Sequence, residues 1–230
     1  MAMQYRSITD INIYDSPQLE RLATQMAAGR YLVFREPETQ DESQSPDRSP
    51  KQIALLEDGY EGFIHNEDLT NLQAIAGTGY IPQFLTPTEI SAKIDDAIAY
   101  MQRAMQHPNQ YLWGGTVPPD FDCSGLMQAA FVSVGIWLPR DAYQQEAFLE
   151  PIALENLQRG DFIFFGNPTK ATHVGMHLGE GQYIHSSGQE HGHNGIAISS
   201  LSGSDRASLW YAAQLRGAGR VTQCYSPKFC

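Results

Sequence analysis

The sequence predicts two domains: a small β domain and, after it, an α+β domain whose helices pack on one face of an antiparallel sheet. Short strand-like runs broken by turns fill the first third of the chain, and helical patterns lie between residues 86 and 135. A series of strand-like runs follows the helices, which is the order typical of the α+β class. We place the β domain at residues 1–75, a linker at 76–85 and the second domain at 86–230.

Composition and charge are those of an ordinary globular protein. The chain has 230 residues, of which 42% are hydrophobic and 18% charged, so it can bury a sizeable core without disulfides. No apolar run is long enough to span a bilayer, so we expect a soluble protein without a membrane partner. The formal net charge is −11 and no cluster of Lys and Arg stands out, which argues against nucleic acid as a partner.

The N-terminus and the cysteines predict a cytoplasmic protein. Residues 1–7 lack the apolar stretch that drives secretion. The three cysteines, Cys123, Cys224 and Cys230, form an odd and sparse set, and the last two are confined to the tail. A disulfide within the tail stays open as an alternative, but a reducing compartment suits this set better.

The first domain consists of expected strands and turns. The clearest strands are residues 11–14 and 31–34, whereas residues 17–28 fit a helix as well as a strand and stay undecided. Residues 35–51 carry charge and proline, which predicts an exposed, mobile loop. Residues 53–64 predict a hairpin in which an Asp-Gly pair makes the tight turn.

The same hairpin carries a family resemblance. Its run Asp58-Gly59-Tyr60-Glu61-Gly62-Phe63-Ile64, followed by Asp68-Leu69, resembles the strand-turn-strand signature of bacterial SH3-like domains. Phe63 departs from that signature, because tryptophan is commoner at its position. The resemblance covers roughly the first third of the chain and implies a small SH3-like β-barrel.

The helical part of the second domain opens at Thr86. Residues 70–85 contain Gly and Pro without a sustained period, which suits a linker. Thr86 then serves as N-cap, Pro87 takes the first helical position and Glu89 completes a capping box. The expected buried face consists of apolar residues at helical spacing, namely Ile90, Ile94, Ala97, Ile98, Met101 and Met105.

A further helix begins at Cys123. Asp122 is a good N-cap and Gly135 a good stop. The apolar residues between them recur at helical spacing: Leu126, Ala130, Phe131 and Val134. The N–H groups of the first turn place partial positive charge around the sulfur, which favours the nucleophilic thiolate. A buried structural cysteine is the alternative.

Strands complete the domain. The expected runs are residues 161–165, 173–178, 182–186 and 195–199, with a closing strand at 209–215. Most histidines fall in turn-like sequence and are expected to be solvated, namely His65, His107, His191 and His193. His173 and His185 differ because they lie within expected strands.

These two strand histidines can share one face of the sheet. Alternation puts His173 and Gly175 on the same face, and the glycine leaves space beside the imidazole. A three-residue turn at 179–181 would set Gly175 opposite His185 and make the imidazoles diagonal neighbours. A two-residue turn would shift the register by one and send His185 to the other face.

The thiol and the two imidazoles together predict a cysteine hydrolase. Cys123 would attack, His173 would carry its proton and His185 would fix the tautomer of the first ring. We expect the helix end and His173 to depress the pKa of Cys123. Zinc held by these residues is the rival, but one distant cysteine and two histidines lack paired ligand spacing.

Several motifs between residues 111 and 185 support this prediction. In chain order they are Tyr111-Leu112-Trp113-Gly114-Gly115, Phe121-Asp122-Cys123-Ser124-Gly125-Leu126, Leu138-Pro139-Arg140 with Gln144 or Gln145, Gly160-Asp161-Phe162-Ile163-Phe164-Phe165, His173-Val174-Gly175-Met176 and Ile184-His185-Ser186. In these motifs the chain closely resembles the NlpC/P60 family of papain-like cell-wall cysteine peptidases. The resemblance implies a papain-like fold and hydrolysis of peptidoglycan stem peptides at the bond joining γ-D-glutamate to the diamino acid.

The resemblance also implies catalytic roles. Cys123 matches the nucleophile, His173 the base, His185 the third polar residue and Tyr111 a tyrosine near the oxyanion. The backbone N–H of Cys123 is the expected second donor to that oxyanion. Family members with an SH3-like domain ahead of the catalytic one, and without a secretion signal, resemble recycling enzymes. Their substrates are small freed peptides such as L-Ala-γ-D-Glu-diaminopimelate.

Substrate contacts follow from the same comparison. A free L-Ala amine would suit Asp122 or Asp141, with Tyr60 of the first domain closing the end of the cleft. Arg140 would meet the α-carboxylate of D-Glu, and Ser124 is a lesser candidate for touching substrate. Structural alternatives are Asp122 as an N-cap only, Arg140 as a surface cation and Tyr60 as an aromatic packed on its own barrel.

Two other functions stay open. An amidase or acyltransferase on the same fold would act on a substrate outside the cell wall. A cell-wall binding protein with an idle site would bind murein polymer and cleave nothing. No cofactor and no metal are indicated, and we expect a monomer whose partner is a murein peptide.

Overall fold

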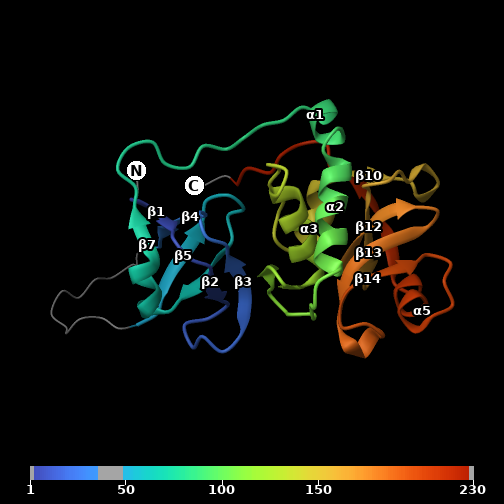
Figure 1. The fold of residues 1–230 in the computed structure, drawn as a ribbon, viewed down its shortest axis with the longest axis horizontal. Coiled ribbons are helices and arrows are strands. Elements are labelled where there is room, and N and C mark those ends of the chain that lie inside the picture. Colours follow the sequence, from blue (N-terminus) through green and yellow to red (C-terminus); the bar gives the residue numbers. More distant parts are fainter. Residues whose placement is uncertain (1–2, 36–48, 228–230) are drawn as a thin grey trace. The chain divides into compact units, whose positions relative to one another are not determined.

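The computed structural model describes residues 3–35 and 49–227, which divide into two compact units (Figure 1). The first unit contains the residues up to Pro82 together with Ser226 and Pro227, and the second runs from Gln83 to Tyr225. The division falls inside the predicted linker, but the two tail residues belong to the first unit. Most of the predicted loop at 35–51 lies outside the described residues. None of the described helices has the length and hydropathy needed to cross a membrane.

The first unit is built from strands and one 3₁₀-helix. Its elements are β1 (Gln4–Ser7), β2 (Ile11–Tyr14), β3 (Leu22–Met26), β4 (Tyr31–Phe34), β5 (Lys51–Leu55), β6 (Glu61–Ile64), η1 (Asn66–Asn71) and β7 (Leu72–Ala74). The strands form one antiparallel sheet in the order β3-β2-β6-β5-β4-β1-β7. The predicted strand-rich first domain is therefore confirmed, whereas its likeness to SH3 domains stays a prediction.

Two local predictions are decided in this unit. The undecided stretch 17–28 contains strand β3, because Thr24 and Met26 alternate into the interior while β3 pairs with β2. The predicted hairpin at 53–64 is confirmed, since β5 pairs with β6. Gly59 makes its turn with a φ of 72°, a left-handed conformation that glycine adopts without strain.

The second unit consists of short helices, a six-stranded sheet and a two-stranded sheet. Its elements are α1 (Pro87–Ser91), α2 (Ile94–Met105), β8 (Thr116–Val117), β9 (Asp120–Phe121), α3 (Cys123–Val132), α4 (Ala142–Phe148), β10 (Glu150–Ile152), η2 (Leu154–Asn156), β11 (Phe162–Gly166), β12 (Ala171–Gly179), β13 (Gln182–Ser187), η3 (Gln189–His191), β14 (Gly195–Ser200), α5 (Arg206–Ala212) and β15 (Leu215–Arg220). The large sheet is antiparallel in the order β10-β15-β11-β12-β13-β14, and β8 pairs with β9. The predicted α+β class is confirmed.

The capping box at Thr86 is confirmed, but the helix it opens is shorter than predicted. Thr86 Oγ1 accepts a hydrogen bond from the Glu89 N–H, and the Glu89 carboxylate accepts from the Thr86 N–H. Helix α1 ends at Ser91, and α2 starts only at Ile94. The expected buried face nevertheless spans both pieces: Ile90, Ala97, Ile98 and Met101 are fully buried, and Ile94 and Met105 partly so.

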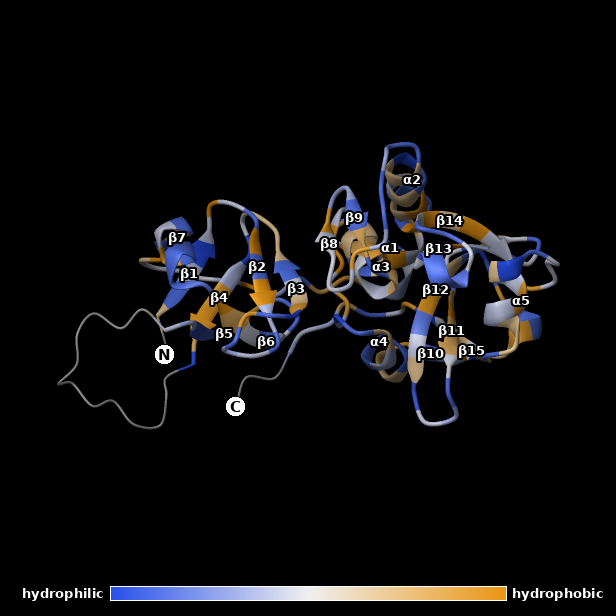
Figure 2. Cartoon of the chain, turned by 90° about the horizontal axis from the view of Figure 1, so that it is seen from below, coloured by the Kyte–Doolittle hydropathy of each residue, from blue (hydrophilic) through white to orange (hydrophobic). Residues whose placement is uncertain are grey.

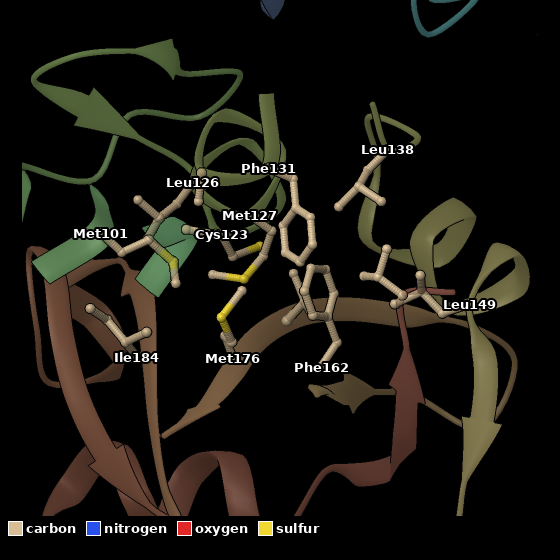
Figure 3. Packing of buried hydrophobic residues seen from close by; sticks show 14 of the residues in the cluster. Met101, Cys123, Leu126, Met127, Phe131, Leu138, Leu149, Phe162, Met176 and Ile184 are labelled. Carbon is tan, nitrogen blue, oxygen red and sulfur yellow. The ribbon is translucent and has the colours of Figure 1, made fainter. Parts of the chain in front are cut away.

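Helices cover both faces of the sheet rather than one. Figures 1 and 2 show α1, α2 and α3 on one side of the strands and α5 on the other. Alternation along β11 explains why both faces are apolar. Phe162 packs toward α3, where its ring meets that of Phe131 edge to face at 5.4 Å (Figure 3), whereas Phe165 packs with Tyr211 of α5.

The predicted closing strand at 209–215 is wrong. Those residues fall largely in α5, and the strand that completes the sheet is β15 at Leu215–Arg220. Asp205 starts this helix, since its carboxylate accepts a hydrogen bond from the Ser208 N–H at 3.0 Å. A helical period then turns Ala207, Ser208 and Tyr211 inward together.

The β12–β13 hairpin reaches the expected register by a different route. Its turn has two residues, Glu180 and Gly181, both with positive φ, whereas three were expected. A β-bulge between His177 and Gly179 adds the missing residue, so Met176 pairs with Ile184 and Gly175 lies opposite His185. A Cβ at Gly175 would come within 2.7 Å of the Tyr183 ring, so this position needs glycine.

Candidate active site

The site starts where α3 starts. Asp122 caps the helix, because its Oδ1 accepts a hydrogen bond from the Gly125 N–H at 2.6 Å. Cys123 is the first helical residue, as predicted. The loop before β8 packs closely over this turn, since a side chain at Gly125 would collide with the carbonyl oxygen of Gly115. The first turn of α3, which carries Cys123, is therefore fixed by the Asp122 cap and by the loop before β8.

A buried ion pair holds the capping carboxylate. Arg140 donates to Asp122 through both terminal nitrogens, Nη1 to Oδ1 at 3.1 Å and Nη2 to Oδ2 at 2.6 Å, and Nη1 also donates to Ser124 Oγ at 3.0 Å. Oδ2 of Asp122 accepts in addition from the Gly114 N–H at 3.0 Å. Arg140 is 1% exposed, so the surface-cation alternative is wrong. Three predicted substrate residues, Asp122, Ser124 and Arg140, thus contact one another. Their contact with substrate stays a prediction.

Burial dominates the chemistry of the thiol. Burial and, next, the Asp122 carboxylate raise the pKa of Cys123 to about 12, although the backbone of Val174 and of Ser124 and the Arg140 cation act in the opposite direction. The predicted depression of this pKa is wrong. Desolvation of a thiolate outweighs the partial positive charge at the helix start.

Alkylation of Cys123 tests the raised pKa. Iodoacetamide reacts with the thiolate, so the rate should keep rising with pH beyond about 8.5, where an ordinary thiol is half ionised. The rate is measured by intact mass in a Cys224→Ser, Cys230→Ser background, with Cys123→Ser in that background as the blank. A plateau reached below about pH 7 would contradict the raised pKa and reveal a thiolate–imidazolium pair instead.

The β12–β13 hairpin brings the two histidines together, as predicted. Nε2 of His173 lies 2.8 Å from Nδ1 of His185, and both rings are buried. Because His173 is engaged through Nε2, its Nδ1 is left for a thiol. Burial is the main cause that lowers the pKa of both imidazoles. The pKa of His173 falls well below its ordinary range, and that of His185 falls to about 3. Both rings are therefore neutral at pH 7.

The sulfur lies against the strand that carries His173. Hydrogen bonding from the backbone of Val174, the residue after His173, acts on the thiol. Tyr211 lies near both the thiol and the imidazole. Its ring stacks on that of His173 with a centroid distance of 4.0 Å and an interplanar angle of 18°. Burial raises the pKa of Tyr211, and the Cys123 charge raises it further.

Tyr211 was missed by the sequence analysis. Its hydroxyl lies 2.8 Å from Oγ of Ser187, which fixes the ring over His173. The error follows from placing residues 209–215 in a strand. The capping pattern Asp205-x-x-Ser208 ahead of an apolar run is the signal that predicts the helix and, with it, an inward-facing Tyr211.

Tyr111 approaches the sulfur from the loop that leads to the helix. It forms a β-bridge with Phe121, two residues before Cys123. Burial is the main cause that raises the pKa of its phenol, and the nearby charges of Cys123 and Asp122 add to the rise. The phenol therefore stays protonated and can donate a hydrogen bond beside the thiol.

The two remaining predicted substrate residues belong to other elements of the fold. Asp141 is half-buried at the start of α4, where its N–H donates to Gln144 Oε1 at 3.0 Å. Tyr60 belongs to the first unit and packs against that unit's core. Their roles toward substrate stay predictions. Within residues 3–35 and 49–227, no three His, Cys, Asp or Glu side chains are grouped so that they could hold a metal ion.

This arrangement belongs to the papain-like class, in which a helix carries the cysteine against a sheet that carries its histidine. Residues 108–213 match the model of the NlpC/P60 family, and this part of the chain is a domain of that family. The resemblance seen in the motifs is thereby confirmed.

The chain is also similar to individual proteins. The chain is 36% identical over 122 residues to a gamma-DL-glutamyl hydrolase of Bacillus subtilis. The aligned segment covers 51% of this chain and 27% of the relative. It is 34% identical over 135 residues to a gamma-D-glutamyl-L-lysine dipeptidyl-peptidase of Bacillus cereus, with coverages of 57% and 37%. An NlpC/P60 family crystal structure from Bacillus cereus is 24% identical, with a TM-score of 0.49 over 96% of this chain and 64% of that one. The chain thus spans well under half the length of these two curated relatives.

Proposed function

We propose that this chain is a cysteine endopeptidase that hydrolyses the γ-D-glutamyl-diamino acid bond of peptidoglycan stem peptides. The observation that carries the proposal is the capped thiol of Cys123 beside the strand of His173, whose ring is bonded to His185. The names of the two curated relatives, a gamma-DL-glutamyl hydrolase and a gamma-D-glutamyl-L-lysine dipeptidyl-peptidase, support the type of bond.

In the first step, Sγ of Cys123 attacks the scissile carbonyl carbon while Nδ1 of His173 takes the thiol proton. Because the thiol and the imidazole are both neutral at rest, the proton moves during the attack rather than before it. The carbonyl oxygen becomes an oxyanion. We assign the Tyr111 hydroxyl and the backbone N–H of Cys123 as its donors.

The second half of the cycle regenerates the thiol. The C–N bond breaks as the leaving amine takes the proton from Nδ1 of His173, and the acyl group remains on Sγ as a thioester. Water then attacks the thioester while His173 accepts a water proton, and the C–S bond breaks. The proton returns to sulfur, so each turnover consumes one water and releases one carboxylic acid and one amine.

We further propose that the substrate carries a free N-terminal L-Ala whose ammonium group meets Asp141. Asp122 is only 7% exposed, whereas Asp141, which forms a capping box with Gln144 at the start of α4, is half-buried, so a ligand can approach its carboxylate more easily. A requirement for a free amino end suits small peptides released from the wall. In this proposal the enzyme works in murein peptide recycling in the cytoplasm.

Cleavage of two matched peptides tests the proposal. L-Ala-γ-D-Glu-diaminopimelate should be cleaved at the γ-glutamyl bond, and its N-acetyl form at least about tenfold more slowly, since each 1.4 kcal/mol of lost contact is a factor of ten. Products are identified by mass spectrometry. Asp141→Asn should slow cleavage of the free peptide only, which brings the rates on the free and the acetylated peptide closer together. Asp96→Asn, on the exposed side of α2, is the control and should leave both rates unchanged.

The outcomes separate the parts of the proposal. Equal cleavage of both peptides would refute recognition of a free amine but leave the peptidase intact. Failure to cleave either peptide would refute the peptidase itself.

A further inference from the structure

A chain of hydrogen bonds continues from the paired histidines to a third histidine. Nε2 of His185 lies 2.9 Å from Oγ of Ser199, and the same oxygen lies 3.2 Å from Nε2 of His193. Ser199 is buried on β14, the strand beside β13, and His193 is half-buried just before β14. The expectation that His193 is simply solvated is therefore wrong.

We propose that Ser199 and His193 are positioning residues that set the tautomer of His173, and thus decide whether His173 can act as the base. This inference rests on the proposed function, in which Nδ1 of His173 takes the thiol proton. It extends that function by two residues that touch neither the thiol nor, in the proposed reaction, the substrate.

The bonds that join His173, His185 and Ser199 have two self-consistent orders of protons. Each nitrogen of a neutral imidazole either donates or accepts, and a serine hydroxyl has one proton to give. In the first order, Nε2 of His173 donates to Nδ1 of His185. Nε2 of His185 then donates to Ser199, and the Ser199 hydroxyl donates to Nε2 of His193. Nδ1 of His173 then carries a lone pair, so the ring can accept the thiol proton.

The second order reverses every bond. His193 donates from Nε2 to Ser199, Ser199 donates to Nε2 of His185, and Nδ1 of His185 donates to Nε2 of His173. The remaining proton of His173 then sits on Nδ1, so the ring cannot act as the base. Because His173 and His185 are buried and neutral, the order of protons rather than charge links His193 to the base.

His193 favours the first order when its Nε2 carries the lone pair. The imidazole then accepts the Ser199 proton, which leaves the Ser199 oxygen to accept from Nε2 of His185. Removing His193 takes away this acceptor.

Imidazole tautomers can be read directly. In protein labelled with ¹⁵N-histidine, long-range ¹H–¹⁵N spectra at pH 8 should show His173 and His185 with their protons on Nε2. Ser199→Ala removes the link, and the Nδ1–H form of His173 should then become detectable. Ser200→Ala on the same strand is the matched control, because its hydroxyl bonds only to Ser202 among the described contacts, and it should leave the spectrum unchanged.

Kinetics provide a second, independent readout. His193→Gln keeps an oxygen that can accept from Ser199, so kcat at pH 8 should stay near that of the wild type. His193→Ala should lower kcat roughly tenfold with KM unchanged, as expected when a base is only partly in its active tautomer. His107→Gln in the exposed turn after α2 is the control.

These measurements distinguish the inference from the proposed function. The tautomer spectra need no activity, so a wild type that cleaves no peptide would refute the peptidase while the spectra still decide the role of Ser199 and His193. Should Ser199→Ala fail to fold, the surface-side His193→Ala gives the same spectral test. An unchanged His173 tautomer together with an unchanged kcat in His193→Ala would overturn the inference.

Discussion

Replacing Cys123 by serine should lower kcat/KM for the free stem peptide by roughly 10⁴-fold or more. The hydroxyl sits where the thiol was, but it is a much weaker nucleophile toward a neutral imidazole base. Removing one member of a group that acts as a unit leaves only binding and oxyanion stabilisation. The measurement is release of the diamino acid product, followed by mass spectrometry under saturating and subsaturating peptide.

Cys224→Ser is the matched control for this variant. Cys224 is the other free and buried cysteine within residues 3–35 and 49–227, so its replacement tests the loss of a buried thiol without touching the site. Activity should survive in Cys224→Ser, and both variants should melt close to wild type. A Cys123→Ser protein with more than about a tenth of the wild-type rate would show that another group is the nucleophile.

The cysteine's position could be predicted because its causes are local. An N-cap at Asp122 and a run of apolar residues at helical spacing suffice to start a helix at Cys123, and the structure has that helix and that cap. The pKa of the same thiol could not be predicted. It depends on how deeply the sulfur is buried and on the Asp122 carboxylate, and burial is a property of the assembled domain.

The histidine pair was predicted correctly, although one premise was wrong. Alternation along two strands is a local property, and it put His173 and His185 on one face. The register depends on a turn and a bulge together, and only Gly179 hints at the bulge in the sequence. A shorter turn with a bulge gives the same pairing as a longer turn without one.

The partners of the histidines could not be found from their own strands. Tyr211 reaches His173 from a helix on the far face of the sheet, and Ser199 reaches His185 across a strand pair. Both contacts join residues distant in sequence. An apolar run such as residues 209–215 satisfies strand and helix patterns alike, so the cap at Asp205 decides between them.

Replacing Arg140 by methionine should destabilise the second unit by about 3–5 kcal/mol. The change leaves the Asp122 carboxylate inside the protein without its cation, and an uncompensated buried charge is costly. Urea unfolding followed by a second-unit signal measures the loss. Arg159→Met is the matched control, because the Arg159–Asp95 pair is largely exposed and should be worth less than about 1 kcal/mol.

The double variant Asp122→Asn, Arg140→Met separates the charge from the cap. It removes both members of the pair while asparagine still caps α3, so most of the lost stability should return. An equal loss in Arg140→Met and Arg159→Met would contradict the buried pair. If stability returns but peptide cleavage does not, the pair also tunes the thiol, because Asp122 raises the pKa of Cys123 and Arg140 opposes that rise. If both return, the pair serves only to hold the first turn of α3 in place.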